Sequence, residues 1–121
     1  MNYLRLHADK NGKSRFEQAS LKLDEPDYRP PAPTAFVSHS YQTDSLQFVR
    51  LPSGWNADAV NPPSKQFLIG LKGHIEITAG DGEKHSIGPG DRVLMEDVDG
   101  SGHHARVKGD GEFLGAVIPV S

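Results

Sequence analysis

Glycine and proline are spread so densely along this chain that they decide its fold class. The 121 residues include 13 Gly and 9 Pro, and both residue types interrupt regular helices, glycine through its flexibility and proline through its missing N–H group. No stretch between them forms a convincing amphipathic helix, whereas several short runs alternate apolar and polar residues, as half-buried strands do. The sequence therefore predicts an all-β protein.

From Thr34 onward, candidate strands recur at short and regular intervals, which is typical of a β-sandwich or a β-barrel. The clearest turn lies at residues 79–82, where glycine can adopt the positive φ that a tight hairpin requires. We expect strands over residues 35–39, 45–51, 65–71, 74–79, 84–87, 92–96, 104–107 and 112–120.

The first 33 residues have a weaker pattern than the rest of the chain. Ser14 to Glu17 matches a helix capping box, yet Ala19, Leu21 and Leu23 alternate as in a strand. The prolines that follow up to residue 33 favour a strand running into an extended connector. We therefore expect residues 1–33 to form an N-terminal strand arm, packed on a barrel or on a partner subunit, and residues 34–121 to form the barrel itself.

Size, charge and cysteine content exclude several classes of function. A chain of 121 residues has room for one core and thus one domain. Its 13 basic residues are scattered, and the net charge is -3, so we expect no nucleic-acid partner. The absence of cysteine removes disulfides, thiolate metal ligands and cysteine nucleophiles. No export signal and no long apolar stretch are present, so we expect a cytoplasmic protein without a membrane partner.

Two glycine-containing motifs carry a resemblance to a known family. Gly73 directly follows the apolar run 67–72, and Gly88–Pro89–Gly90–Asp91 turns sharply into the next run. This pattern resembles the cupin superfamily. The first cupin motif consists of His-x-His, a short gap, a Glu and, after six further residues, a Gly. The second motif begins with Gly-Asp and contains a histidine. The resemblance implies a cupin-type double-stranded β-helix, which is an RmlC-like jelly-roll barrel.

Other residues occupy most of the positions that hold metal ligands in cupins. Val60 and Pro62 stand at the histidine positions of the first motif, and Gln66 stands at the position of its glutamate, seven residues before Gly73. The second motif keeps one histidine, which falls on His103. Because metal sites need three or four strong ligands, we expect no cofactor. A divalent metal, if one binds, would use His103, Gln66 and Glu96.

A narrower resemblance covers most of the chain. It is to small single-domain bacterial cupins that read Pro, a Trp-His segment, Ala-Pro-x-Arg-Gln, and later Glu-Asp-x-x-Gly-Lys-Gly-His. The corresponding stretches here are residues 52–55, 62–66 and 96–103. The resemblance implies a fold rather than a reaction, because one barrel scaffold supports many chemistries.

The candidate catalytic residues are His103, Glu96 and Asp97. A carboxylate beside a histidine at the mouth of a barrel is the arrangement that tunes a general base. Adjacent strand residues face opposite sides, so only one of His103 and His104 points inward. The family position favours His103, and a register slip of one residue would exchange the two.

The candidate substrate-binding residues are Gln66, Tyr41, Trp55 and His104. Gln66 shares a strand face with Leu68, so its amide should enter an apolar cavity, where it needs a hydrogen-bond partner. That partner is either a ligand or a group across the barrel, such as Tyr41. Trp55, the only tryptophan, fits a structural plug under a loop as well as a binding contact.

These residues lead to a small-molecule-binding cupin as the first hypothesis for function. As an enzyme, it would be an isomerase, dehydratase or lyase that uses acid–base chemistry in the barrel pocket. The alternatives are a non-catalytic ligand-binding or sensor cupin, and a metal-dependent dioxygenase or lyase. We also expect a homodimer, because a strand arm could cover the exposed sheet edge and apolar outer face of a partner.

Overall fold

The protein consists entirely of strands and the loops between them. The computed structural model describes residues 1–121 and contains no helix. The prediction of an all-β protein is therefore confirmed. Its strands are β1 (Asn2–Ala8), β2 (Ser14–Ser20), β3 (Glu25–Asp27), β4 (Ala35–Val37), β5 (Gln47–Leu51), β6 (Asn56–Val60), β7 (Gln66–Lys72), β8 (His74–Thr78), β9 (Lys84–Ile87), β10 (Arg92–Met95), β11 (His103–Lys108) and β12 (Phe113–Pro119).

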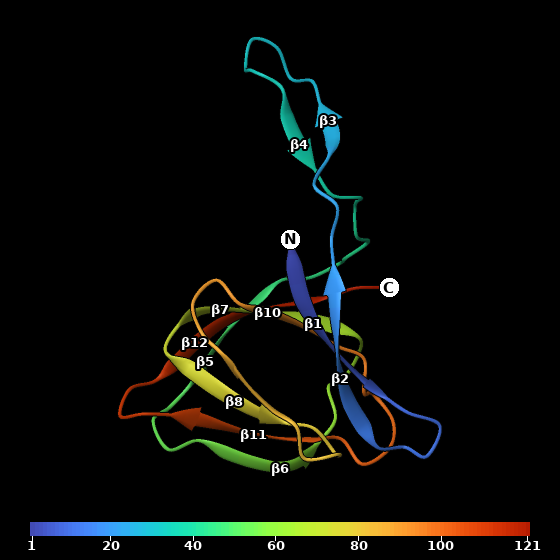
Figure 1. Ribbon diagram of the computed structural model, residues 1–121. Coiled ribbons are helices and arrows are strands. Elements are labelled where there is room, and N and C mark those ends of the chain that lie inside the picture. Colours follow the sequence, from blue (N-terminus) through green and yellow to red (C-terminus); the bar gives the residue numbers. More distant parts are fainter.

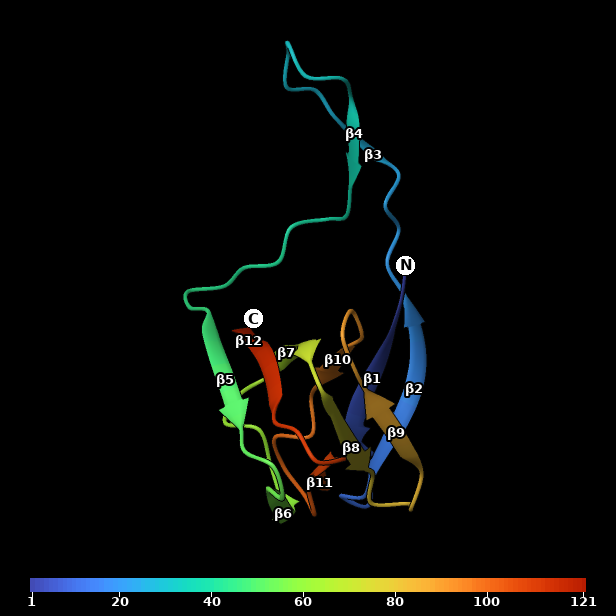
Figure 2. The same ribbon diagram turned by 90° about the vertical axis from the view of Figure 1, so that its left-hand side faces the viewer.

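Two facing sheets make the body of the molecule, and a hairpin projects from it (Figures 1 and 2). The six-stranded sheet has the order β2-β1-β10-β7-β12-β5, and the four-stranded sheet has the order β6-β11-β8-β9. Neighbouring strands are antiparallel except β1 and β10, which pair in parallel. The third sheet is the hairpin of β3 and β4, which stands away from the body.

The main core lies between the two large sheets. Leu6, Val93 and Met95 of the six-stranded sheet belong to one buried cluster with Ile75 and Ile77 of the four-stranded sheet. These residues alternate with polar or outward-facing ones along their strands, so each strand presents a single apolar face. Burying each such side chain contributes roughly 1.5–3 kcal/mol, which holds the two sheets together.

A second, smaller cluster covers the opposite face of the six-stranded sheet. It contains Phe67, Leu94 and Val120, with Tyr3 and Tyr41 packed against them. The Phe67 ring meets Tyr3 edge-on at 5.7 Å and Tyr41 at 5.1 Å between ring centroids. The middle of this sheet is therefore buried on both faces, which explains the unbroken apolar runs in β7 and β10.

The sheets do not close into a barrel. One sheet ends at β2 and β5, and the other at β6 and β9, with no hydrogen-bonded strand pair joining them. On one side the gap is bridged by side chains, because the rings of Phe16 and His85 lie 4.5 Å apart. The expected closed barrel is thus not found, and the body is an open sandwich. The structure also contains no helix of the length and apolarity needed to cross a bilayer.

The N-terminal segment is divided between the body and the projection. The strand alternative at Ser14 is confirmed, since β2 occupies Ser14–Ser20 and pairs with β1 in the six-stranded sheet. The capping-box alternative is wrong because the Ser14 hydroxyl bonds to distant loops rather than to a helical turn. The segment that leaves the body comes later, and we call residues 22–40 the projecting hairpin.

Candidate functional site

A buried carboxylate–imidazole pair is the main polar feature of the interior. Asp97 Oδ2 lies 2.6 Å from His103 Nδ1. Asp97 is completely buried, and His103 is 6% exposed. Asp97 comes shortly after β10, and His103 opens β11. The pair therefore joins the end of one large sheet to the beginning of a strand in the other.

Strand alternation directs Asp97 into the sandwich and Glu96 out of it. Met95 belongs to the main core, whereas Leu94 belongs to the cluster on the opposite face. Continuing that alternation places Glu96 outside and Asp97 inside. The backbone at Asp97 is held as well, because the side-chain amide of Asn61 donates to its carbonyl oxygen at 2.8 Å.

Glycine lets the loop between Asp97 and His103 approach β6 closely. Gly102 has a φ of 71°, and a Cβ atom there would lie 2.3 Å from the carbonyl oxygen of Val60. Val60 in turn is the strand partner of His103. Any larger residue at position 102 would push this contact apart and displace the histidine.

The hydrogen bond joins Nδ1 of His103, and not Nε2, to Asp97. In the tautomer in which Nδ1 carries the hydrogen, Nδ1 donates it to the carboxylate. Nε2 then keeps its lone pair, and it makes no hydrogen bond within the chain. The other carboxylate oxygen, Oδ1, is buried without a partner. His103 is therefore the sole side-chain partner that offsets the burial of this carboxylate.

Glu96 belongs to a different set of interactions. It forms ion pairs with Arg5 and, at 3.5 Å, with Lys65. Arg5 also meets Glu17 at 3.2 Å, and its hydrogen bond to Glu96 raises the pKa of Arg5 above its ordinary value. The structure thus brings Asp97, and not Glu96, to His103.

The other predicted site residues are spread over both faces of the six-stranded sheet. Gln66 is 9% exposed and follows the inward alternation of β7, and its amide makes no hydrogen bond. Tyr41 packs on Phe67, which neighbours Gln66 but faces the opposite way. Burial beside Tyr3 raises the pKa of Tyr41. Gln66 and Tyr41 are therefore not brought together.

Trp55 and His104 lie on the side of the four-stranded sheet. The Trp55 side chain packs against the main core, and its carbonyl oxygen accepts a hydrogen bond from Val107. His104 faces outward, where Nε2 lies 2.6 Å from Asn56 Oδ1 and 3.2 Å from Asp58 Oδ1. The two adjacent histidines thus have different environments, one buried and one on the surface.

A shallow surface hollow of about 250 Å³ is lined in part by His103. Two further hollows, of about 160 and 510 Å³, lie beside β1 and at the base of the projecting hairpin, and no predicted site residue lines either of them. Of the three hollows, this is the one that His103 lines. It is lined by Ala59, Thr78, Ala79, Gly80, Ser101, Gly102, His103 and His104.

Sequence reasoning missed Ser14, a buried hydroxyl that supports one wall of this hollow. Ser14 Oγ donates to the carbonyl oxygen of Gly102 at 2.7 Å and accepts from the N–H of Gly80 at 2.7 Å. It therefore ties the loop before His103 to the β8–β9 turn. Nothing in the local sequence signals this role, because both partners are distant along the chain.

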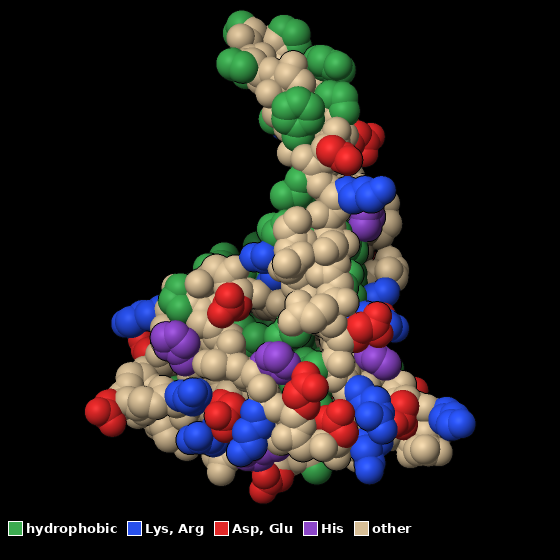
Figure 3. Space-filling view, in the orientation of Figure 1, with side chains coloured by type: hydrophobic (Ala, Val, Ile, Leu, Met, Phe, Trp, Pro, Cys, Tyr) green, Lys and Arg blue, Asp and Glu red, His purple; other side chains and the backbone are tan.

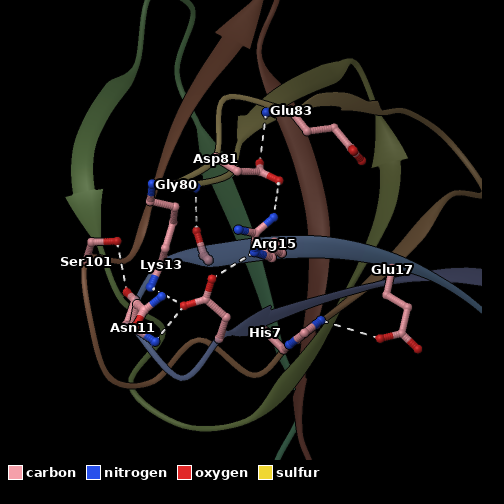
Figure 4. A network of polar contacts seen from close by, with 12 residues as sticks. His7, Asn11, Lys13, Arg15, Glu17, Gly80, Asp81, Glu83 and Ser101 are labelled. Carbon is pink, nitrogen blue, oxygen red and sulfur yellow. Dashed lines mark hydrogen bonds and ion pairs between the residues drawn. The ribbon is translucent and has the colours of Figure 1, made fainter.

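A network of polar and charged residues lies beside this wall, around Arg15 and Asp81 (Figure 4). Asp9 accepts hydrogen bonds from the N–H groups of Asn11 and Lys13, and its other oxygen lies 2.8 Å from Arg15 Nε. Arg15 also reaches Asp81 of the β8–β9 turn at 3.6 Å. The guanidinium of Arg15 holds the pKa of Asp9 below its usual range. This network links the β1–β2 turn to the β8–β9 turn.

The residues present do not assemble the metal triad of cupins. No three His, Cys, Asp or Glu side chains lie close enough together to hold a metal ion. Of the three residues named for a possible metal, Glu96 is paired with Arg5 and Lys65 on the outer face. His103 and Gln66 remain inside, and neither is joined by a second histidine.

The chain was compared with family models, with curated proteins and with solved structures. No family model matches the chain, and no curated protein matches it. Among solved structures, the chain is similar to the crystal structure of protein NMB1881 from Neisseria meningitidis, at 14% sequence identity and a TM-score of 0.47. The match covers 68% of this chain and 84% of that one.

Proposed function

We propose that this chain is a cupin-like jelly-roll protein that binds a small molecule and moves a proton on it with His103. The reaction would be an isomerisation, a dehydration or a lyase step. The observation that carries the proposal is the buried pair formed by Asp97 and His103, with 2.6 Å between Oδ2 and Nδ1. The remaining predicted residues add less, because the structure does not gather them around the pair.

The pair has the features that a general base requires. Nε2 of His103 has a free lone pair, so it can accept a proton from a C–H or O–H group of a bound molecule. The positive charge that then develops on the imidazole lies beside the Asp97 carboxylate, which stabilises it. Returning the proton to another atom of the same molecule completes an isomerisation, and returning it to a leaving hydroxyl completes a dehydration.

Two motif glycines support the cupin-like part of the proposal. Gly73 has a φ of 73°, and a Cβ atom there would lie 2.2 Å from the carbonyl oxygen of Glu112. Gly90 has a φ of 83°, as the turn before β10 requires. Both positions thus need glycine for physical reasons, and both are positions at which cupins carry it. Two facing antiparallel-rich sheets are the layers from which a jelly roll is built.

Hydrogen–deuterium exchange tests the proposed proton transfer without knowledge of the substrate. The protein would be incubated in D₂O with a panel of small 2-hydroxy acids, 2-keto acids and reducing sugars, and loss of C–H signals followed by ¹H NMR. We expect the wild-type protein to exchange at least one compound, and His103→Gln to lower that rate by about 10²–10⁴-fold. His74→Gln is the matched control and should retain the rate, because His74 is exposed and does not line the hollow. Exchange that His103→Gln leaves unchanged would refute the proposal.

A non-catalytic binding protein is the second candidate, and the size of the hollow favours it. About 250 Å³ lies below the roughly 300–1,000 Å³ of usual ligand pockets, so a ligand there would be small and partly exposed. In this case compounds of the panel would broaden or shift the His103 ring resonances without any exchange of their C–H groups. The same panel therefore separates binding from catalysis.

Chelation tests the metal-dependent alternative. The exchange assay would be repeated after exhaustive dialysis against a chelator and again after addition of Mn²⁺, Fe²⁺, Ni²⁺ or Zn²⁺. The proposed chemistry predicts no change, because the proton acceptor is Nε2 of His103. Loss of exchange that a divalent metal restores would replace it with a metal-dependent reaction.

A further inference from the structure

The chain exposes more surface than a compact protein of its size. Its accessible surface is 7372 Å², whereas the scaling law for folded monomers gives about 6,400 Å² for a mass of 13.2 kDa. The excess is thus about 950 Å². A stable protein–protein interface buries about 800 Å² on each partner, so the excess is of the size that one such interface would remove.

The projecting hairpin is the source of much of this surface. None of residues 22–40 is buried, and Figures 1 and 2 show the hairpin standing clear of both large sheets. Its strands β3 and β4 are paired over only three residues each. A two-stranded hairpin without further packing is marginally stable in water at best. The hairpin therefore lacks, within its own chain, the contacts that would hold it in place.

Apolar side chains cover the hairpin, as the space-filling view in Figure 3 shows. Tyr28 is 73% exposed and Phe36 61% exposed, and three prolines lie at the tip between them. Scattered apolar residues on a surface are normal, but a continuous apolar projection of this kind indicates an interaction site. The hairpin is thus built to contact a protein surface.

A matching surface lies on the outermost strand of the six-stranded sheet. β5 pairs with β12 on one side only, so its other edge offers free N–H and C=O groups. Phe48 on this strand is 74% exposed, and Leu46 just before it is 55% exposed. An open edge that carries exposed apolar side chains can accept an added strand or hairpin.

We propose that the projecting hairpin of one chain docks on β5 and the neighbouring outer face of a second copy, and that the exchange is reciprocal. A second copy is the partner that the molecule itself supplies, because each chain carries both the hairpin and the acceptor strand. A two-fold axis then forms two identical contacts at once. Phe36 of each chain would pack against Phe48 of the other.

The charges on the hairpin and on the acceptor surface are complementary. Asp24 and Glu25 at the root of the hairpin are exposed and form no ion pair within the chain. On the acceptor side, Arg50 and Lys72 share the single carboxylate of Glu112, at 3.3 and 3.9 Å. The acceptor surface therefore has an excess of positive charge that the acidic root of the hairpin can offset.

A complementation experiment tests the reciprocal contact. Masses would be measured by light scattering after gel filtration for the wild-type chain and for Phe36→Asp, Phe48→Asp and Val98→Asp. We expect the wild-type and the Val98→Asp control, altered at an exposed apolar residue outside the hairpin and β5, to have twice the chain mass of 13.2 kDa. Phe36→Asp and Phe48→Asp should each be monomeric, since both contacts are lost.

Mixing the two monomeric variants is the decisive step. In a mixed dimer, the intact hairpin of the Phe48→Asp chain meets the intact β5 of the Phe36→Asp chain, so one of the two contacts is restored. We expect the equimolar mixture to show dimer that neither variant forms alone. A wild-type monomer at about 100 μM, or dimers that withstand both substitutions, would overturn the proposal; at that concentration even a modest Kd near 10 μM would show clearly.

Disulfide trapping provides a readout that does not depend on losing the dimer. The chain has no cysteine, so Phe36→Cys and Phe48→Cys chains each carry one thiol. After mixing and mild oxidation, we expect the mixed covalent dimer to exceed both like-with-like dimers. A predominance of dimers between two Phe36→Cys chains would show that hairpins pack on hairpins, which would refute the assignment of β5 as acceptor.

Discussion

The chemistry available to His103 depends on its hydrogen bond to Asp97. Asp97 is completely buried, and His103 Nδ1 is the group bonded to its side chain. A carboxylate in such a place fixes the imidazole in the tautomer that leaves Nε2 free. The proposed use of His103 as a base therefore depends on a residue that is itself completely buried.

Replacing Asp97 by Asn should reverse the tautomer of His103. An amide can donate a hydrogen bond to Nδ1, which places the ring hydrogen on Nε2 and removes the proposed base. We expect two-bond ¹H–¹⁵N spectra to show the Nδ1–H form in the wild-type protein and the Nε2–H form in Asp97→Asn. The deuterium exchange assay should lose about 10²–10⁴-fold in the same variant. An Asp97→Asn spectrum identical to that of the wild type would show that Asp97 does not orient the ring.

The exposed pair of Asp9 and Arg15 gives a prediction for pH. The hydrogen bond from Arg15 and the backbone N–H groups of the turn hold the pKa of Asp9 below 3.8. Because the pKa is lower in the folded protein, the pair stabilises the fold above the unfolded-state pKa, and this contribution is lost as the pH falls through the folded-state value.

Arg15→Gln should therefore raise the pKa of Asp9 toward 3.8 and reduce stability more at pH 7 than at pH 2. An NMR titration of the Asp9 carboxyl carbon checks the first expectation, and urea unfolding at both pH values checks the second. Lys10→Gln is the control, because Lys10 lies in the same turn and forms no ion pair. An equal loss of stability at both pH values would mean that Arg15 acts through packing rather than charge.

Sequence reasoning named Asp97 and His103 and favoured His103 for the interior from its family position, but the local pattern alone could not orient either residue. Glu96 and Asp97 are adjacent, as are His103 and His104, so in each case one faces the interior and the other the solvent. Which one faces in depends on the register of β10 against β7 and of β11 against β8, and both pairings join segments far apart in the sequence. A slip of one residue would exchange every assignment.

At the scale of secondary structure, Ser14 joins a strand of the six-stranded sheet to two loops beside strands of the four-stranded sheet. Its hydroxyl contacts Gly102 before β11 and Gly80 after β8, although it lies at the start of β2. Ser14→Ala would leave the buried carbonyl of Gly102 without a partner and remove the part-buried hydrogen bond from the Gly80 N–H, and a buried group left without a partner costs about 1–3 kcal/mol.

Urea unfolding of Ser14→Ala should show that loss, and the His103 resonances should shift, because Gly102 precedes the histidine. Ser20→Ala is the matched control at the other end of β2, where the hydroxyl bonds to Asn2 on the surface. The control should change stability by less than about 0.5 kcal/mol. Equal effects of the two substitutions would contradict the role given to Ser14.

The strands that sequence reasoning located are those with a strong local pattern. β7, β8 and β9 are apolar or alternating and are separated by glycine, so their positions agree with the expected ranges within a residue or two. β6 was not predicted, because Asn56–Val60 contains a single β-branched residue and precedes two prolines. That strand exists through its pairing with β11, which no local pattern could reveal.

At the scale of the whole molecule, the sequence predicted an extended segment near the N-terminus but not which of its residues leave the body. Prolines between residues 26 and 33 predicted an extended segment near the N-terminus, and the projecting hairpin contains them. The preceding strands were assigned to the same arm, whereas β1 and β2 belong to the six-stranded sheet. The parallel pairing of β1 with β10 spans most of the chain, and contacts of such long range leave no trace in local periodicity.

The body should fold without the projecting hairpin, since no residue from 22 to 40 is buried. Replacing residues 22–38 by a Gly/Ser linker of equal length keeps the cost of closing this loop nearly unchanged. We expect the amide resonances of the body to stay in place, and the free energy of unfolding of the dilute, monomeric chain to change by less than about 0.5 kcal/mol.

Protein concentration then separates the body from the assembly. If the hairpin serves association, the Tm of the wild-type protein rises with concentration, because the dimer binds only folded chains. The linker variant should instead have a Tm that is independent of concentration and equal to the wild-type value at high dilution. The dilute linker variant could instead lose more than about 2 kcal/mol in free energy of unfolding, a magnitude typical of core damage. That result would show that the hairpin stabilises its own chain.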